Sequence, residues 1–384
     1  MNIANIIEVG RYGGPQNRIV SIANSLKPLG IDTYVIYPQD ESAVFKKHLE
    51  KNNIKNICLP LHRLTKDKKH LLKYIFFFIY ELVILTRYLK KHEFDLIHVS
   101  GGAWQFKGAI AGKLAGIKVL WHLNDTQMPF ILRFVFRIIA TFCADSFIVA
   151  GERVKDYYLK SFNFDKKKVF DVQAPVDTKK FNPVKITNNA FIPSTKRLSI
   201  LTVSHITPIK GLEYFVNMAA QLNTKYTNLE FYIIGEQYNN HKKYAEKLFN
   251  ICKDKQVNNI QFCGAKDNIP EVLKDADIYV CSSIAEASPI SVWEAMSMEK
   301  PIVSTDVGDV SRFIKNGYNG YITPACDSNE LTNMVSKFIE NENLRDELGI
   351  NARKTALKYL DTSIILKSYY KIYSNFKNSN LCKN

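Results

Sequence analysis

The most informative part of the chain is residues 275–308, DADIYVCSSIAEASPISVWEAMSMEKPIVSTDVG. It begins with an apolar segment, residues 278–283, which is typical of a buried strand. A polar loop follows, then a helical segment at residues 291–298, and then a second apolar segment at residues 301–305. Strand and helix patterns that alternate at this spacing predict βαβ units and a parallel sheet.

The same alternation runs through the whole chain. Strand-like segments lie at residues 2–9, 32–37, 96–99, 118–122, 146–150 and 168–172, and again at residues 199–203, 230–234, 260–262, 278–281 and 301–304. A chain of 384 residues with 46% hydrophobic content is too long for one ordinary core. We therefore expect an α/β fold with two Rossmann-like domains facing a central cleft. The expected domains are residues 1–173 and 174–362, with a C-terminal helix at about 363–380 packing back on the first.

Two glutamates within residues 275–308 suggest which ligand this part of the chain binds. Glu286 lies in the loop and Glu294 lies one turn into the helix, so the two carboxylates could hold two different sets of ligand hydroxyls. Between them, the backbone N–H groups of Ile290 and Ser291, after Pro289, lie at a helix N-terminus, where a phosphate is favoured. Carboxylates for sugar hydroxyls beside a phosphate-binding helix start are typical of a nucleotide-sugar site.

The cysteines and the N-terminal residues indicate the cellular compartment in which the protein works. The seven cysteines show neither CxxC pairs nor the His/Cys spacing of a zinc site, so we expect no disulfides and a reducing environment. Residues 1–7 lack the basic segment and cleavage site of a signal peptide and are instead typical of a first strand. These features predict a cytoplasmic protein.

Positive charge is concentrated in the first half of the chain. Residues 1–170 carry 26 Lys and Arg against 14 Asp and Glu, whereas residues 171–384 carry 26 against 23. A basic half predicts an anionic partner, which could be membrane phospholipid, a lipid-diphosphate acceptor or nucleic acid. Because no helix-turn-helix, RNP-like or zinc-finger pattern accompanies the charge, we expect no nucleic acid partner. A generally lysine-rich composition would explain the same charge without any partner.

Two apolar stretches bear on the membrane question. Residues 71–85 are interrupted by Lys73 and Glu81 and are too short for a membrane-spanning helix, which needs about 20 predominantly apolar residues. Residues 128–143 carry two arginines among aromatic and aliphatic side chains. Both stretches could be helices packed on a sheet, or they could present a basic, aromatic face to an anionic membrane surface.

Several motifs, in this order and spacing, resemble one family along nearly the whole chain. They are residues 10–16, 275–283, 286–296, 301–308, 314–321 and 345–353. The chain resembles the retaining glycosyltransferases of the group 1 type, glycosyltransferase family four, which have the GT-B fold of two Rossmann-like domains. The resemblance implies an enzyme that moves a sugar from a nucleotide-sugar donor to a glycan or lipid-linked acceptor with retention of configuration. It also implies a role in the biosynthesis of a cell-surface polysaccharide such as capsule, O-antigen or lipopolysaccharide.

The resemblance assigns roles to the charged residues of the second half. It implies that Lys210 neutralises the donor diphosphate, that Glu286 binds donor-sugar hydroxyls and that Glu294 binds the ribose. Five positions before Lys210 the family usually has an arginine, but this chain has His205. A histidine is positive only when protonated, so this departure puts part of the diphosphate-binding charge in doubt.

Four glycines lie in loops that follow expected strands, at positions where the family also has such loops. Gly13 and Gly14 open the first helix, where backbone N–H groups could approach a phosphate or the acceptor, although an ordinary strand–helix turn has the same glycines. Gly235 and Gly264 follow strands on the donor side, and the resemblance places the nucleotide base near Gly264.

Two residues are expected on the acceptor side. His122 would end a strand and project into the cleft, where the family commonly has a histidine that contacts the donor sugar, so we group it with Glu286 and Lys210 as catalytic. A lone histidine is also common as a structural residue, and we expect His98 to be of that packed kind. Asp125 could orient the acceptor hydroxyl.

The expected mechanism needs neither metal nor cofactor. No pair of carboxylates of the DxD type follows a strand, and charge developing on the leaving β-phosphate would be met by Lys210, His205 and the helix start at Ile290–Ser291. Two alternatives remain. One is a transferase with a soluble acceptor, whose apolar stretches would pack inward, and the other is a nucleotide-sugar-binding protein without turnover, which the His205 departure keeps open.

Overall fold

The computed structural model describes residues 1–65, 67–160, 168–186, 197–238 and 241–381. The chain divides into two compact units: unit 1 contains residues 1–173 and 365–384, and unit 2 contains residues 174–364. Among the described residues, no helix is both long and apolar enough to cross a membrane.

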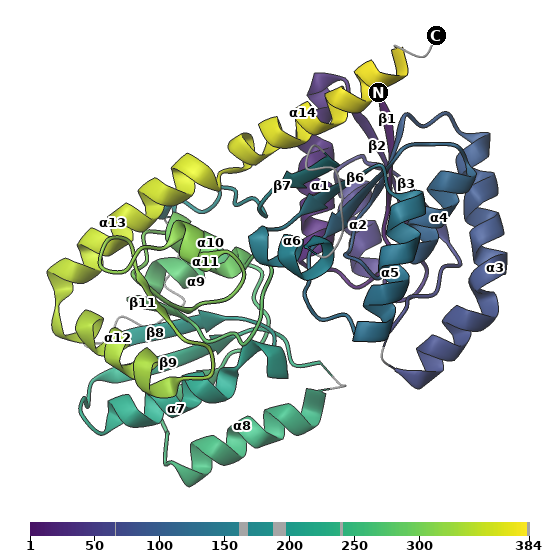
Figure 1. Cartoon of the computed structure of the whole chain (residues 1–384). Coiled ribbons are helices and arrows are strands. Elements are labelled where there is room, and N and C mark those ends of the chain that lie inside the picture. The colour runs from purple at the N-terminus through teal and green to yellow at the C-terminus, as the bar shows by residue number, and fades with distance from the viewer. Residues whose placement is uncertain (66, 161–167, 187–196, 239–240, 382–384) are drawn as a thin grey trace. The chain divides into compact units, whose positions relative to one another are not determined.

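Unit 1 is built on a parallel sheet with the strand order β3-β2-β1-β4-β5-β6-β7 (Figure 1). The strands are β1 (Asn2–Ile6), β2 (Asp32–Pro38), β3 (Lys55–Leu59), β4 (Leu96–Val99), β5 (Val119–Leu123), β6 (Ser146–Val149) and β7 (Val169–Asp171). The helices are α1 (Gly14–Leu26), α2 (Ala43–Lys51), α3 (Lys68–Lys91), α4 (Phe106–Leu114), α5 (Phe130–Cys143), α6 (Glu152–Leu159) and most of α14 (Thr362–Leu381).

Successive side chains along each strand of unit 1 point to opposite faces of its sheet, and helices cover both faces. Ile3, Leu96 and Leu120 pack with Ile22 of α1 and Tyr369 of α14 in one cluster. On the other face, α4 contacts β4 and β5 and lies between α3 and α5. Helix α14 therefore joins unit 1 as part of its core, although it follows the whole of unit 2 in the sequence (Figure 1).

Unit 2 repeats the architecture with the strand order β10-β9-β8-β11-β12-β13. Its strands are β8 (Leu198–Val203), β9 (Leu229–Ile234), β10 (Ile260–Phe262), β11 (Ile278–Cys281), β12 (Ile302–Thr305) and β13 (Tyr321–Thr323). Its helices are η4 (Pro208–Lys210), α7 (Leu212–Asn223), α8 (Lys242–Asp254), α9 (Ile269–Asp275), α10 (Ile290–Ser297), α11 (Val310–Phe313), α12 (Ser328–Glu340) and α13 (Glu342–Tyr359).

The expected α/β fold with two Rossmann-like parallel sheets is confirmed. Two strands, β3 and β13, were not expected, because each lies at the edge of its sheet and β3 exposes polar side chains. In both sheets the strand order reverses next to the first strand, at β1/β4 in unit 1 and at β8/β11 in unit 2. In open parallel sheets, ligands bind outside the carboxyl ends of the strands at such a switch point.

Candidate active site

The loops that follow β8 and β11 are tied together at the switch point of unit 2. After β8, helix η4 ends at Gly211, whose φ of +57° is strained for other residues and whose Cβ, if present, would lie 2.3 Å from the carbonyl oxygen of Ser282. The Ser282 hydroxyl donates a hydrogen bond to the Lys210 carbonyl oxygen (3.1 Å), and the Ile284 N–H donates to that of Ile209 (2.8 Å). This close approach fixes the position of Lys210 relative to the loop of Glu286.

Lys210 and Glu286 form an ion pair in that position. The Lys210 Nζ lies 2.5 Å from the Glu286 Oε1, and the Ser283 hydroxyl donates to the same oxygen (2.9 Å). Burial lowers the pKa of Lys210, but the Glu286 carboxylate more than offsets this, so the pKa lies above its ordinary value. Lys210 is therefore a cation at neutral pH, and its partner is the Glu286 carboxylate.

Glu294 lies on α10 in an environment that disfavours its charge. Burial raises the pKa of this carboxyl to about 7, and the nearby Lys180 opposes the shift only in part. A carboxyl held near its protonation point at neutral pH is common at functional sites, because a ligand can then supply the hydrogen bonds that favour the ionised form.

The start of α10 is anchored through Ser288. Its hydroxyl oxygen accepts hydrogen bonds from the Ala174 N–H (3.1 Å) and from the Trp293 Nε1 (3.0 Å). The N-cap residue is Pro289, which has no polar side chain to cap the first turn, and its carbonyl oxygen accepts from the Val292 N–H (3.0 Å). The backbone N–H groups of the first turn are thus held at a fixed helix start, as an anion site requires.

His205 lies after β8 on the surface of unit 2. Its ring packs against that of Tyr238 with 4.8 Å between centroids, and the Tyr238 hydroxyl lies 3.1 Å from the imidazole Nδ1. Nearby, a Cβ on Gly235 would lie 1.9 Å from the Ser204 carbonyl oxygen, and the Gly235 N–H donates to the Gly264 carbonyl oxygen (2.9 Å). The close backbone approach between the ends of β8 and β9 explains why Gly235 has no side chain.

In unit 1, the expected glycine loop opens α1. Gly13 is the N-cap residue and Gly14 the first residue of the helix. A Cβ on Gly13 would meet Gln16 Oε1 at an ordinary 3.7 Å. Packing in unit 1 therefore does not demand a glycine at position 13, which leaves a ligand role for it as a prediction.

The expectation that His122 projects from a strand end is wrong. His122 lies inside β5 with 1% of its surface exposed, and the Arg18 Nη1 donates to its Nε2 (3.0 Å). Burial, with a further contribution from Arg18, lowers the pKa of His122 well below its ordinary value, so the ring is neutral. Alternation along β5 explains the error: His122 points to the same face of the sheet as Leu120, which α1 and α14 cover.

Tyrosine hydroxyls hold His98 and Asp125 in unit 1. His98 is packed, as expected, with its Nδ1 2.7 Å from the Tyr373 hydroxyl. The Tyr158 hydroxyl donates to Asp125 Oδ1 (2.7 Å), and the Gln127 N–H donates to the same oxygen (3.2 Å). These bonds fix the Asp125 carboxylate after β5, and its role toward an acceptor stays a prediction.

Sequence reasoning missed a cluster of buried charges in unit 1. Lys107 of α4 is fully buried, and its Nζ lies 2.5 Å from Glu81 Oε2, 3.6 Å from Glu8 Oε2 and 4.3 Å from the centre of the Tyr74 ring. Burial raises the pKa of Glu8 to about 7 even though Lys107 opposes the shift. One sign of this cluster was visible, because Glu81 interrupts the apolar stretch at residues 71–85.

A cavity of about 310 Å³ lies beside this cluster, where β1, β2 and β3 end. Its charged lining comes from both signs: Glu8 after β1, Asp40 and Glu41 after β2, Arg63 after β3, and His70 and Lys73 in the first turns of α3. It is therefore a polar cavity at the carboxyl edge of the unit 1 sheet, the edge where ligands of such sheets bind.

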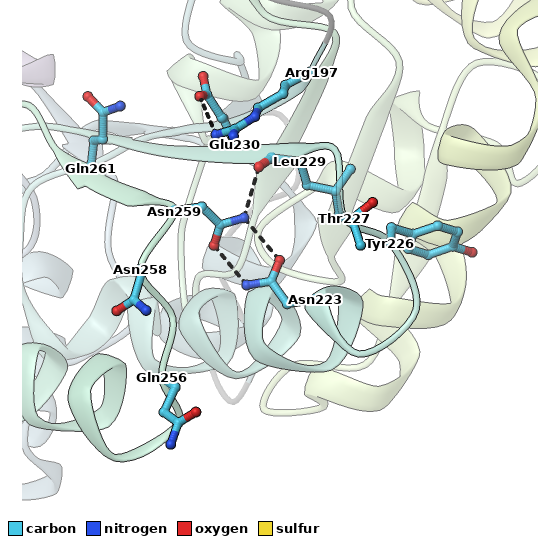
Figure 2. A pocket seen from close by; sticks show the side chains of 10 residues that line it. All are labelled: Arg197, Asn223, Tyr226, Thr227, Leu229, Glu230, Gln256, Asn258, Asn259 and Gln261. Carbon is cyan, nitrogen blue, oxygen red and sulfur yellow. Dashed lines mark hydrogen bonds and ion pairs between the residues drawn. The ribbon is translucent and has the colours of Figure 1, made fainter.

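A second cavity, of about 480 Å³, lies in unit 2 at the amino ends of β8, β9 and β10, away from the edge that carries Lys210 and Glu286 (Figure 2). There Asn223 and Asn259 exchange side-chain hydrogen bonds of 2.7 and 3.0 Å, and Arg197 pairs with Glu230 at 3.1 Å. Because these polar groups bind one another at the amino ends of the strands, we do not assign the donor site to this cavity.

Two parallel-sheet α/β units of this kind make up the GT-B fold. A family model described as Glycosyltransferase Family 4 matches residues 12–180, and one described as Glycosyl transferases group 1 matches residues 185–355. The chain belongs to the group 1 glycosyltransferases of family 4, and it is a glycosyltransferase.

Relatives and solved structures agree with this assignment. The chain is 25% identical over 372 residues to the N,N'-diacetylbacillosaminyl-diphospho-undecaprenol alpha-1,3-N-acetylgalactosaminyltransferase of Campylobacter jejuni, covering 92% of this chain and 93% of the relative. It is 25% identical over 309 residues to the UDP-Gal:alpha-D-GlcNAc-diphosphoundecaprenol alpha-1,3-galactosyltransferase of Escherichia coli, covering 74% and 78%. The fold matches the Anabaena protein HepE in complex with UDP-glucose, with a TM-score of 0.83 at 18% identity, covering 98% and 100%.

Proposed function

We propose that the protein transfers a sugar from a nucleotide-sugar donor to a lipid-linked glycan, with retention of configuration, during the biosynthesis of a cell-surface polysaccharide. The observation that carries this proposal is the Lys210–Glu286 pair at the switch point of unit 2, beside the start of α10.

Donor binding exchanges the partners of Lys210 and Glu286. The donor diphosphate replaces Glu286 beside the Lys210 ammonium and reaches the backbone N–H groups of Ile290 and Ser291. Glu286, still held by Ser283, is then free to accept hydrogen bonds from hydroxyls of the transferred sugar. The free protein thus keeps both charges compensated until the ligand arrives. As the bond to the β-phosphate breaks, Lys210 stabilises the developing negative charge, and His205 adds to it when protonated.

Glu294 binds the ribose of the donor in this account. Two ribose hydroxyls donate to a carboxylate better than to a carboxylic acid, so donor binding favours the ionised form of Glu294. In the free protein burial raises its pKa to about 7. Donor affinity should therefore increase as the pH rises through neutrality.

The acceptor proposal rests on the relatives and on unit 1. Both relatives are named for acceptors carried on diphospho-undecaprenol. Residues 1–170 carry the positive balance that a diphosphate acceptor would require. We place the polar head of the acceptor at the cavity where β1, β2 and β3 end, and the protein in the cytoplasm at the inner face of the cell membrane.

Retention and independence of metal complete the proposal. Both relatives are named for alpha linkages, which is the outcome of retention when the donor sugar is also alpha-linked. Within the part of the chain that the structure describes, no group of three or more His, Cys, Asp or Glu residues is placed to hold a metal ion. The charges of Lys210 and the α10 start would then serve the leaving diphosphate, which in turn takes the proton of the acceptor hydroxyl.

The test is a transfer assay with a panel of UDP-sugars and synthetic undecaprenyl-diphosphate-linked N-acetylglucosamine in detergent micelles. Wild-type protein and the Lys243→Met control, a change of an exposed lysine on α8, should form product with one of the donors. Lys210→Met should lower kcat at least about a hundredfold, the scale of losing one transition-state charge contact. The coupling constant of the new anomeric proton reports its configuration. Equal kcat in Lys210→Met and wild type would overturn the assignment of the site.

A further inference from the structure

Helix α3 exposes an apolar stripe along its outer side. Leu72, Phe76, Ile79 and Val83 are 68%, 81%, 67% and 40% exposed. Their spacing of four, three and four residues places them on one face of the helix. Tyr74, which is buried, is two residues or about 200° of rotation away from Phe76, so the stripe points away from the core of unit 1.

Helix α5 repeats the arrangement. Ile131, Phe134, Ile138 and Phe142 are 76%, 58%, 47% and 70% exposed and follow one another at spacings of three, four and four. Phe136, on the opposite side of the helix, is fully buried. Single exposed apolar side chains are ordinary, but two continuous stripes on one unit mark an interaction site.

The two stripes belong to one surface. Helix α4 contacts both α3 and α5, so the three helices lie side by side on one face of the unit 1 sheet (Figure 1). Leu114, at the end of α4, is also exposed, at 52%. We call the two stripes together the α3–α5 surface.

The charges around this surface identify its partner. Helix α3 begins with Lys68 and Lys69 and ends with Lys90 and Lys91, all exposed. The carboxylate inside α3, Glu81, is buried, so it does not offset them at the surface. A second copy of this chain would bring the same positive charges against these lysines, whereas an anionic surface complements them.

We propose that the α3–α5 surface docks on an anionic lipid bilayer, with the aromatic and aliphatic stripes inserted at the boundary of head groups and acyl chains and the lysines against the head groups. This inference rests on the proposed lipid-linked acceptor for its biological purpose, but the surface itself is defined by exposure and charge. Helix α3 lies on the membrane rather than across it.

Helix α3 also links the docking surface to the acceptor cavity. His70 and Lys73, in its first turns, line the cavity of about 310 Å³ where β1, β2 and β3 end. Leu72 and Phe76 of the apolar stripe lie within a turn of Lys73. A lipid-linked acceptor whose chain stays in the bilayer therefore has its polar head brought to the cavity by the helix that docks.

Vesicle flotation without donor or acceptor tests the docking. The probes are vesicles of phosphatidylcholine with 30% phosphatidylglycerol and vesicles of phosphatidylcholine alone, at low and at high salt. Wild-type protein should float with the anionic vesicles at low salt and be released as salt rises. Phe76→Ser/Ile79→Ser and Ile131→Ser/Phe134→Ser should each weaken binding at least about tenfold, the loss expected from removing two inserted apolar side chains.

The control is Ile350→Ser/Leu357→Ser on α13, which removes side chains that are 47% and 43% exposed and should leave vesicle binding unchanged. Wild-type protein that binds neither vesicle, or surface variants that bind as wild type does, would overturn the docking. So would a wild-type dimer in sedimentation velocity that both surface variants dissociate without any vesicle binding. Transfer by the wild-type protein to the micellar acceptor separates the two proposals, because it would persist if only the docking were wrong and would be lost if the proposed function were wrong.

Discussion

Replacing Glu294 with glutamine should stabilise unit 2 above neutral pH while weakening its binding of nucleotide. Burial raises the pKa of Glu294 to about 7 in the folded protein, from an ordinary value of 4.5. Between these two values the unfolded chain has released the proton while the folded protein still holds it. Stability therefore falls as the pH rises from about 4.5 to 7 and stays at its lower level above that.

The size of the effect follows from the shift in pKa. Each unit corresponds to about 1.4 kcal/mol, so the ionisable carboxyl costs up to about 3 kcal/mol at pH 8 and less than about 1 kcal/mol at pH 5. Because the side chain keeps partial contact with solvent, these values are upper limits. Glutamine carries no charge at either pH, so Glu294→Gln should recover the difference at pH 8.

Urea unfolding of the free protein at pH 5 and pH 8 measures this difference through the denaturation midpoint. The matched control is Glu286→Gln, the same chemical change eight residues earlier. It should destabilise or leave stability unchanged, because it removes the partner of Lys210. Glu294→Gln should also weaken protection by nucleotide at pH 8. Equal stability changes at the two pH values, or a destabilised Glu294→Gln protein at pH 8, would show that burial of the charged Glu294 carboxylate does not cost stability.

Three further substitutions probe other parts of the account. Lys107→Met should destabilise unit 1 by about 3–5 kcal/mol in urea unfolding, because it removes the ammonium group that pairs with the buried Glu8 and Glu81. A change below about 1 kcal/mol would contradict this. His205→Arg should tighten the binding of UDP measured by calorimetry, because arginine stays charged at every pH of the assay. The gain in affinity should be larger at pH 8 than at pH 6. Equal affinities of variant and wild type at both pH values would show that this residue does not face the diphosphate. Gly211→Ala should cost at least about 1 kcal/mol of stability and lower nucleotide protection, because its φ is +57°; unchanged protection would mean that the loop position is not needed for binding.

The arrangement of the strands could be predicted from the sequence where the strands are buried. Buried parallel strands are continuous apolar runs, as at Ile278–Cys281, whereas the edge strand Lys55–Leu59 mixes polar and apolar residues and was missed. Lys210 and Glu286 were predicted singly, but their ion pair was not, since it depends on β8 and β11 being neighbours in the sheet.

The direction in which a side chain points was harder to predict from the sequence than the position of its strand. His122 lies close to the end of its strand, as expected, but strand alternation alone cannot say which helix covers each face. That answer required α14, which packs on β5 from almost 250 residues further along the chain. The buried position of Lys107 was equally hidden, because its partners Glu8 and Glu81 come from other elements. Long-range pairing of this kind leaves little trace in local sequence patterns.

Thermal stabilisation by nucleotide-sugars is the first experiment to make on the metal-independent donor site that we propose in unit 2. The purified protein would be heated with UDP-, GDP-, ADP- and dTDP-sugars, each with and without EDTA, beside the Lys210→Met variant. A nucleotide present at about 100 times its dissociation constant adds roughly 2.7 kcal/mol of stability. The account predicts such a shift with one nucleotide, unchanged by EDTA and reduced in the variant. Wild-type protein that shifts with none of them, or only when EDTA is absent, would contradict it.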